Sequence, residues 1–434
     1  IDSIFHITMN SPLMRGAVHS YMEYAIDYAS AGMYDEAVQL LSFVTEETEI
    51  TYPMVYYALG YFYSMMGKKD EAALLYKKAE TMCPDYCFPN KLEEVLMLQD
   101  AMKLNPEGAK APYYLGNFHY AARVYDEAIA CWEKSASIDD TYPTVLRNLS
   151  LAYYNKQKNP QKALAALEKA YKLDESDARI LMELDQLYKK LRYSHRQRLD
   201  FLNAHAEVVE QRDDLCIERI TLYNQLGEYR TAYNLINARK FHPWEGGEGK
   251  VTSQYVFCRV ELAKKALEEK RYADAVSLLK ETEKYPDNLG EGKLSMAEEN
   301  DIHYWLGCAY EGLGEAELAK KYFEWATKGS AEPAIAFFYN DQQPDKIFYQ
   351  GLAWRKLGDE NRARSCFNKL IKHGEQHLFD KVKIDYFAVS LPDLLIWDDD
   401  LNVRNLIHCN LVMGLGYLGL GNKEQARKFL SKVV

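Results

Sequence analysis

The sequence of 434 residues lacks several features that mark particular classes of protein. A transmembrane helix needs roughly 20 consecutive apolar residues, but the longest apolar stretch, residues 411–420, contains three glycines. The eight cysteines are too sparse for the dense disulfide framework of a small secreted domain. Basic residues are outnumbered, 53 Lys and Arg against 64 Asp and Glu, and the net charge is −11. We therefore expect a cytoplasmic protein that contacts neither a membrane nor nucleic acid.

The sequence does contain a repeated spacing of small and large residues, within a composition that is 48% hydrophobic. Five glycines are each followed, after twelve residues, by an alanine: Gly60 by Ala72, Gly116 by Ala128, Gly307 by Ala319, Gly351 by Ala363 and Gly414 by Ala426. A large side chain lies four positions after each alanine, at Tyr76, Trp132, Phe323, Phe367 and Leu430. An aromatic residue lies three positions after four of the five glycines, at Tyr63, Tyr310, Trp354 and Tyr417, and His119 takes its place in the fifth. A second set of glycines precedes an alanine by five residues, at Gly32, Gly67, Gly227, Gly314, Gly358 and Gly421.

This spacing resembles the tetratricopeptide repeat, a 34-residue helix–turn–helix unit with the pattern W-x2-L-G-x2-Y, then A-x3-F, then P. A small residue at the point where two antiparallel helices cross lets them approach closely, and large side chains fill the adjacent spaces. Each unit buries its apolar face by stacking on its neighbours. The sequence therefore predicts an all-α fold, a right-handed α-solenoid of about nine to ten tetratricopeptide-like helical pairs.

The repeat length changes along the chain and indicates two arms. Early repeats follow one another after 34 or 35 residues, and those beyond residue 213 follow after 43 or 44. We expect a linker or the remnant of a preceding domain at residues 1–17, a first arm at residues 18–211, and a second arm, truncated at its C-terminal end, at residues 212–434.

An insertion interrupts the first arm. Four of its apolar residues lie at helical spacing: Leu92, Val95, Leu96 and Met102. They predict an extra amphipathic helix near residues 88–103.

Two loops of the second arm repeat each other. The sequences FHPWEGGEGK at residues 241–250 and YPDNLGEGK at residues 285–293 share Pro, Gly, Glu, Gly and Lys at the same phase, 43 residues apart. Because 43 is also the local repeat length, we expect the loops to emerge side by side, with Glu248 near Glu291 and Lys250 near Lys293.

These loops have two interpretations. In the first, they bind a polar or sugar-like ligand, or use paired glutamates as acid and base, through His242, Trp244, Glu245, Glu248, Lys250, Glu291 and Lys293. In the second, each Gly-Glu-Gly-Lys sequence is a tight turn whose glutamate caps the following helix.

A narrower resemblance is based on motifs spread over nearly the whole chain. They are CFPxxLEE at 87–94, YYLGN at 113–117, RNL at 147–149, ELDQLY at 183–188, the loop at 241–250 and FAVSLPD at 387–393. Together they look like the C-terminal tetratricopeptide half of a bacterial family whose members carry an N-terminal β-rich domain similar to sugar mutarotases. The resemblance implies that such a domain precedes Ile1 in the native protein and that carbohydrate is a ligand class. It implies no assigned reaction.

Resemblance to tetratricopeptide repeats also implies a concave groove that binds extended peptides along the first helix of each pair. Carrying the groove positions over gives Tyr57, Tyr61, Tyr113, Asn117, Tyr120, Arg147, Asn148 and Tyr154. Tyrosine offers stacking area and a polar tip, which suit a peptide or a sugar. The alternative is that several of these tyrosines pack between helices. Tyr113 and Glu183 stand where family members that clamp acidic C-termini need cations, so we do not expect that ligand.

We predict no metal, no cofactor and no catalytic residue in this segment. Cys83 and Cys87 offer two ligands, and no nearby pair completes a set of four. His373 and His377 have the spacing of a zinc-binding helix, but Gly374 follows the first of them directly. We therefore expect ordinary loop and helix side chains at these four positions.

The function predicted from these features is a non-catalytic scaffold that binds a protein or peptide through the tyrosine-rich groove and the Gly-Glu-Gly-Lys loops. A competing hypothesis is the accessory arm of a carbohydrate-active bacterial enzyme whose catalytic domain lies upstream. A third is self-association of the chain into a homo-oligomer.

Overall fold

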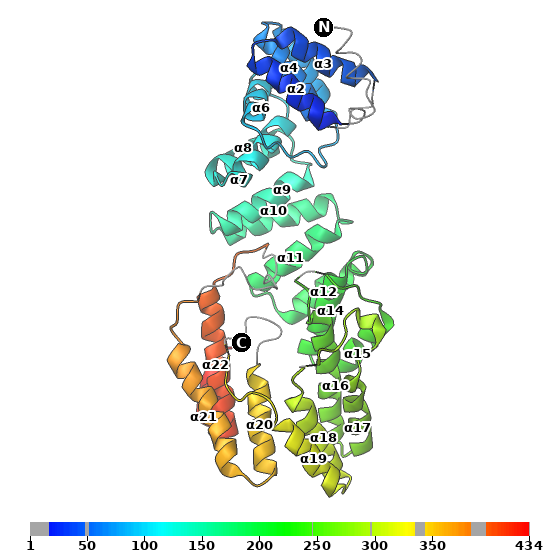
Figure 1. Cartoon of the computed structure of the whole chain (residues 1–434), viewed down its shortest axis with the longest axis vertical. Coiled ribbons are helices and arrows are strands. Elements are labelled where there is room, and N and C mark those ends of the chain that lie inside the picture. The colour runs from blue at the N-terminus through cyan, green and yellow to red at the C-terminus, as the bar shows by residue number, and fades with distance from the viewer. Residues whose placement is uncertain are drawn as a thin grey trace. The chain divides into compact units, whose positions relative to one another are not determined.

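The computed structural model describes residues 17–47, 52–244, 246–295, 297–334, 343–382 and 396–433. These ranges form α-helices joined by turns and loops, with two single turns of 3-10 helix (Figure 1). The chain divides into two compact units, Ile1–Ile180 and Leu181–Val434. Among the described helices, none has both the length and the apolar character that crossing a membrane requires. The arm boundary at residue 211 expected from the repeat length stays a prediction.

The first unit is a stack of helical hairpins. Its described helices are α2 (Val18–Ser30), α3 (Tyr34–Glu47), α4 (Met54–Met65), α5 (Lys69–Glu80), α6 (Leu92–Leu104), α7 (Lys110–Ala121), α8 (Tyr125–Ile138), α9 (Pro143–Asn155) and α10 (Pro160–Leu173). The pairs α2–α3, α4–α5, α7–α8 and α9–α10 pack along their lengths, while α6 packs against both α4 and α7. Successive hairpins touch through α3 with α4 and through α8 with α9.

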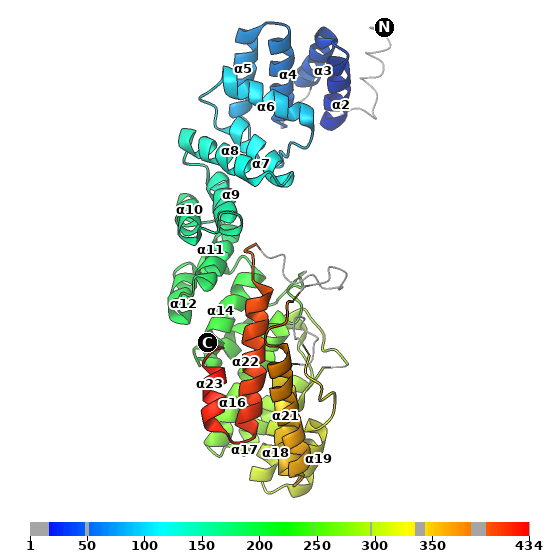
Figure 2. The same cartoon turned by 90° about the vertical axis from the view of Figure 1, so that its left-hand side faces the viewer.

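The second unit continues from α11 (Ala178–Lys190), which begins just before the boundary. Its other described elements are α12 (His195–Ala204), α13 (Ala206–Val209), α14 (Asp213–Gln225), α15 (Tyr229–Ala238), α16 (Lys250–Glu268), α17 (Tyr272–Lys280), η1 (Glu281–Glu283), η2 (Asp287–Leu289), α18 (Asn300–Gly312), α19 (Ala316–Ala326), α20 (Pro344–Lys356), α21 (Glu360–His377), α22 (Leu401–Gly419) and α23 (Lys423–Leu430). Helices α21 and α22 run side by side in both views (Figures 1 and 2). The predicted all-α architecture of stacked helical pairs is confirmed in the parts of the chain that the structure describes.

A close contact between a glycine and a large side chain holds the two helices of a hairpin together. A Cβ atom built on Gly116 of α7 would lie 2.4 Å from Trp132 of α8, a distance that no Cβ tolerates. The same clash arises at the other four predicted glycines, where the opposing residues are Tyr76, Phe323, Phe367 and Leu430. Each glycine and its large partner are sixteen residues apart in the sequence because they lie on opposite sides of the same helix crossing.

The turn of each hairpin is closed by a recurrent hydrogen bond. In α4–α5, Gly67 has a φ of +78°, and the next amide, of Lys68, donates to the carbonyl of Tyr63 over 2.9 Å. This is the Schellman ending of a helix, which needs a residue with positive φ. Equivalent bonds end on the carbonyls of Tyr28, His119, Tyr223, Tyr310, Trp354 and Tyr417. The carbonyl at the aromatic position thus accepts a bond from the residue that follows the turn glycine, so two separate signals in the sequence mark one turn.

The extra helix α6 does not bury all of its apolar residues. Leu92 and Leu96, both among the four that predict this helix, are 74% and 51% exposed. The side chains that pack inward are those of Met97, Leu98 and Ala101. The insertion has apolar residues on more than one face of this helix, so their spacing alone does not identify the buried face.

Trp397 contacts α11, at the beginning of the second unit, from a position near the end of the chain. Its side chain is 1% exposed, and its indole N–H donates to the carbonyl of Glu183 in α11 over 3.0 Å. Nearby, Asp399 forms an ion pair of 3.0 Å with Lys190, which lies at the end of α11. The segment that leads into α22 therefore lies against α11, more than 200 residues earlier in the chain.

The glycine contact predicts a destabilising substitution. Gly116→Ala places a methyl group against Trp132, and overpacking of this kind should lower the free energy of unfolding by about 1–3 kcal/mol. Thermal unfolding followed by circular dichroism measures the change. Gly292→Ala is the control, because a Cβ there meets no atom within 4 Å. An unchanged midpoint for Gly116→Ala would show that the contact is not needed.

Candidate functional site

A chain of polar side chains crosses three helices of the first unit. The indole N–H of Trp132 on α8 donates to Asn117 Oδ1 on α7 over 3.1 Å. Asn148 Nδ2 on α9 donates to the same oxygen over 3.3 Å, and Arg147 donates to Asn148 Oδ1 over 3.3 Å. Asn117, Arg147 and Asn148 are half-buried, whereas Trp132 is buried. These residues together with Tyr120 are called the α7–α9 face below.

Tyr120 extends this face toward the turn of the hairpin. Its ring packs against Trp132 with centroids 5.2 Å apart and edge-on against Tyr125 with centroids 5.0 Å apart. The ammonium group of Lys156 lies 4.5 Å from the centroid of the Tyr125 ring. Four of the sequence-predicted residues, namely Asn117, Tyr120, Arg147 and Asn148, thus lie on adjacent helices of one structural unit.

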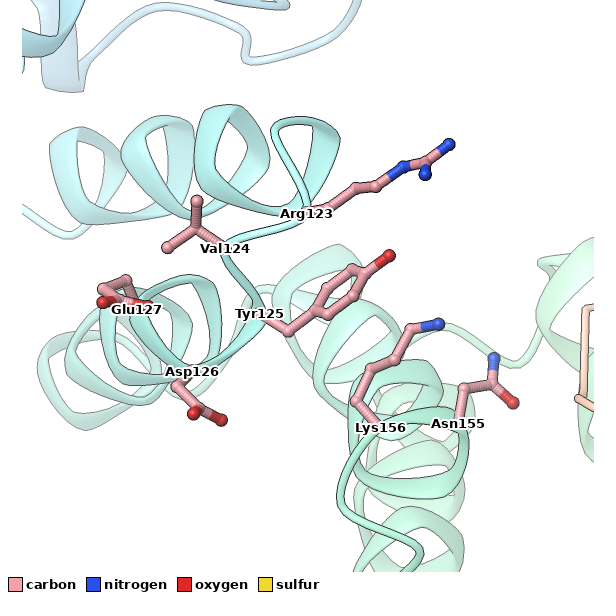
Figure 3. A pocket seen from close by; sticks show the side chains of 7 residues that line it. All are labelled: Arg123, Val124, Tyr125, Asp126, Glu127, Asn155 and Lys156. Atoms are coloured by element: carbon pink, nitrogen blue, oxygen red, sulfur yellow. The ribbon is translucent and has the colours of Figure 1, made fainter.

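A shallow hollow of about 510 Å³ lies beside Tyr125. It is lined by Arg123, Val124, Tyr125, Asp126, Glu127, Asn155 and Lys156. These residues come from the α7–α8 turn, the first turn of α8 and the end of α9 (Figure 3). Sequence analysis did not identify this site, because its helix positions are not those of the predicted groove.

Two of the predicted groove tyrosines are core residues. Tyr57 is fully buried, donates its hydroxyl to Glu80 over 3.0 Å and packs on Tyr76 and Tyr114. Burial and the charge of Glu80 raise the pKa of Tyr57 well above its usual value. Tyr113 is 5% exposed and packs on Tyr114 and Tyr142. For these two residues the structure corresponds to the alternative in which tyrosines pack between helices.

Besides Tyr120, two further predicted tyrosines are accessible in part. Tyr61 on α4 and Tyr154 on α9 are both half-buried. Burial raises the pKa of the Tyr61 hydroxyl, with smaller contributions from Tyr34 and Asp100. Whether either residue binds a ligand stays a prediction.

The two similar loops of the second unit contact each other. The amide of Phe241 donates to the carbonyl of Asn288 over 2.7 Å, and Asn288 Nδ2 donates to the carbonyls of Ile236 and Arg239. The carboxylate of Glu291 accepts the amide of Gly249 over 3.1 Å, at the start of α16. Glu291 of the second loop therefore caps α16, the helix that follows the first loop.

Glu291 is held in this capping position by its surroundings. The hydroxyl of Thr252 also donates to its carboxylate, over 3.4 Å. Burial raises the pKa of Glu291, and the nearby negative charge of Glu248 adds to the increase. Glu248 itself is half-buried. The two glutamates are thus electrostatically coupled, but the hydrogen bonds of Glu291 belong to the helix start.

The remaining loop residues have mixed surroundings. The ammonium group of Lys293 donates to the carbonyls of Thr282 and Glu283 and pairs with Glu299, so it holds the loop in place. His242 is mainly exposed, with its ring nitrogen Nδ1 3.1 Å from Asp213 Oδ2. The side chain of Trp244 lies against Gly247. Lys250 is exposed, and Glu245 lies outside the described residues.

The predicted cysteine and histidine pairs differ in their surroundings. Cys83 is exposed and Cys87 is buried. The rings of His373 and His377 lie with centroids 4.5 Å apart, and His408 of α22 lies 6.1 Å from His373. Across the described ranges, no group of three or more His, Cys, Asp or Glu side chains is arranged to hold a metal ion.

Comparison with protein-family models identifies tetratricopeptide repeats in both units. The matched segments are residues 55–86, 301–328 and 347–373. Each match corresponds to a hairpin described above or to part of one. The chain therefore carries tetratricopeptide repeats.

Several solved structures are similar to parts of this chain. MamA from Desulfovibrio magneticus RS-1 is 18% identical over 46% of this chain and 99% of its own, with a TM-score of 0.27. PilF from Pseudomonas aeruginosa is 18% identical over 51% of this chain and 89% of its own, with a TM-score of 0.30. YrrB, described as a TPR protein with an unusual peptide-binding site, is 16% identical over 49% of this chain and 90% of its own, with a TM-score of 0.30. At these TM-scores the similarities carry no argument about ligands.

The loop contacts predict different roles for the two glutamates. Glu291→Ala removes the acceptor of the Gly249 amide, so the first turn of α16 should open more often, by about fivefold for a hydrogen bond of about 1 kcal/mol. Hydrogen exchange of the amides in that turn measures the opening. Glu248→Ala should leave exchange unchanged. Equal effects of the two substitutions would contradict a capping role for Glu291.

The histidine cluster predicts a loss of stability in mild acid. Burial, with His377 and His408 nearby, lowers the pKa of His373 from its usual 6.5 to about 4. Between these values the unfolded chain binds a proton that the folded chain does not, so stability falls as the pH drops from about 6.5 to 4. Thermal midpoints at pH 7 and pH 5 should show a smaller difference for His373→Gln than for the wild type. An equal difference would exclude His373 as a cause.

Proposed function

We propose that this chain is a tetratricopeptide scaffold whose first unit binds an extended peptide of a protein partner across the α7–α9 face. The observation that carries the proposal is the hydrogen-bonded chain from Trp132 through Asn117 and Asn148 to Arg147. It links amide and guanidinium groups on α7 and α9, the first helices of two successive hairpins.

The chemistry of this surface suits a peptide backbone. An extended peptide presents N–H and C=O groups in alternation, and an asparagine side chain can donate to one and accept from the other. The Asn117 oxygen is shared by Trp132 and Asn148, whereas its amide nitrogen donates to no described residue. Tyr120 adds an aromatic surface beside these amides, which favours contact with a peptide side chain.

Order in the unbound protein supports the proposal further. Asn117 and Asn148 are already fixed by hydrogen bonds to each other and to neighbouring side chains. Side chains that are ordered before binding lose less conformational entropy when a ligand arrives. A peptide would therefore meet a surface that needs little rearrangement.

The paired loops do not favour a second function. Glu291 and Lys293 make hydrogen bonds that hold the loops and start a helix. A pair of glutamates acting on a sugar would need both carboxylates directed at the substrate. We therefore propose neither catalysis nor a carbohydrate site at these loops.

The proposal is tested by panning a random dodecapeptide phage library on the full chain and measuring the selected peptides by fluorescence anisotropy. The double substitution Arg147→Ala and Asn148→Ala should weaken binding by about tenfold, because each lost hydrogen bond is worth about 0.5–1.5 kcal/mol. The control is Asn361→Ala with Arg362→Ala, an adjacent Asn-Arg pair exposed on α21 of the second unit.

Two results would reject this function. One is a panning experiment that enriches no peptide above an uncoated surface. The other is a set of selected peptides whose affinity is the same for the α9 double variant and the α21 control.

A further inference from the structure

The hollow beside Tyr125 contains a residue in an unusual backbone conformation. Arg123 has a φ of +64° in the turn between α7 and α8. It lies five residues before Ala128, a position that is occupied by glycine in six other hairpins and by a lysine with positive φ in two more, at Lys158 and Lys270. In those hairpins the glycine has a φ between +78° and +85°. The Schellman bond is nevertheless formed, with the amide of Val124 donating to His119 over 2.8 Å.

Arginine at this position costs stability compared with glycine. A non-glycine residue in the left-handed region costs of order 1–3 kcal/mol, and such residues concentrate at functional sites. The Arg123 side chain is exposed and makes no hydrogen bond, ion pair or ring contact with the described residues. No contact of its side chain with the described residues therefore offsets this cost.

A second cation approaches the hollow from the neighbouring hairpin. Lys156, at the end of α9, is exposed and lies over the Tyr125 ring. Figure 3 shows Arg123, Tyr125 and Lys156 extending toward the same side, whereas Asp126 and Glu127, which also line the hollow, extend in other directions. Two positive groups and a phenolic hydroxyl thus face one open space.

We infer that this hollow binds the carboxylate side chains of an acidic peptide segment, through Arg123 and Lys156 with Tyr125 as an additional donor. A guanidinium group matches the two oxygens of a carboxylate, and an ammonium group contributes a compact charge. The inference rests on the proposed function, since Tyr120 packs on both Trp132 and Tyr125 and joins the hollow to the α7–α9 face.

This site differs from a clamp for a peptide C-terminus. Such a clamp needs cations on the first helices of successive hairpins, where this chain has the buried residue Tyr113. The two cations of the hollow lie instead at a hairpin turn and at a helix end. The chain has a net charge of −11, so attraction of an acidic peptide depends on local groups of cations such as this one. Acidic peptides should therefore bind at this hollow, and their binding should weaken as salt is added.

The test compares two matched phage libraries on the full chain. One library carries Asp or Glu at half of twelve positions, and the other carries Asn or Gln at the same positions. The wild type should retain the acidic library about tenfold better at low salt. The double substitution Arg123→Gly and Lys156→Gln should remove this preference, because both cations are lost.

The control variant alters a similar pair of residues in the second unit, one with a positive φ and one close to a tyrosine ring. Lys270 also has a positive φ, +58°, and Lys265 lies 5.7 Å from the centroid of Tyr229, both in the second unit. Lys270→Gly with Lys265→Gln should leave the preference for acidic peptides unchanged. Arg123→Gly should melt at or above the wild-type temperature, since glycine adopts this conformation without strain. Arg123→Asn, which also tolerates a positive φ, should likewise lower the preference.

The outcomes separate this inference from the proposed function. Equal retention of both libraries, with binding still lost on substitution of Arg147 and Asn148, would overturn the hollow and leave the peptide scaffold intact. An acidic preference that survives the Arg123 and Lys156 substitutions would also overturn it. Retention of neither library would reject both proposals.

Discussion

The architecture depends on the approach of two helices at a residue that has no side chain. Where a glycine meets Tyr76, Trp132, Phe323, Phe367 or Leu430, the helices of a hairpin come close enough for the large group to cover the opposing backbone. That contact sets the crossing of the helices, and the Schellman bond then fixes where the chain reverses. The α7–α9 face is a direct consequence, because Trp132 reaches Asn117 from the side of the α7–α8 crossing. The proposed binding face and the packing of the hairpin therefore share the same tryptophan.

Much of this arrangement could be predicted from the sequence, because the intervals between glycine, alanine and the large residues are fixed by helix geometry. The contact of the two similar loops followed from their spacing in the same way. The orientation of individual side chains did not follow. Tyr57 and Tyr113 lie at groove positions but are buried against other tyrosines. Glu291 shares a motif with Glu248, and only Glu291 accepts a helix amide.

Other features could not be predicted because the sequence carries no local signal for them. A glycine in the sequence indicates a turn with positive φ, whereas Arg123 adopts a positive φ although arginine gives no such indication. The contact of Trp397 with α11 joins residues separated by more than 200 positions, far beyond any repeat interval. In α6, apolar residues occur on exposed and buried faces alike, so periodicity could not choose between them.

The Trp397 contact has a consequence for how the second unit acquires its structure. In a linear repeat array each hairpin needs its immediate neighbours alone, so the array can grow from one end as the chain emerges from the ribosome. Here α11 has a carbonyl and a lysine whose partners are synthesised more than 200 residues later. Contacts of such sequence separation slow folding, because a long loop must close before they form. These two contacts of α11 can therefore form only after Trp397 and Asp399 have been synthesised, so the last step in assembling the beginning of this unit depends on its end.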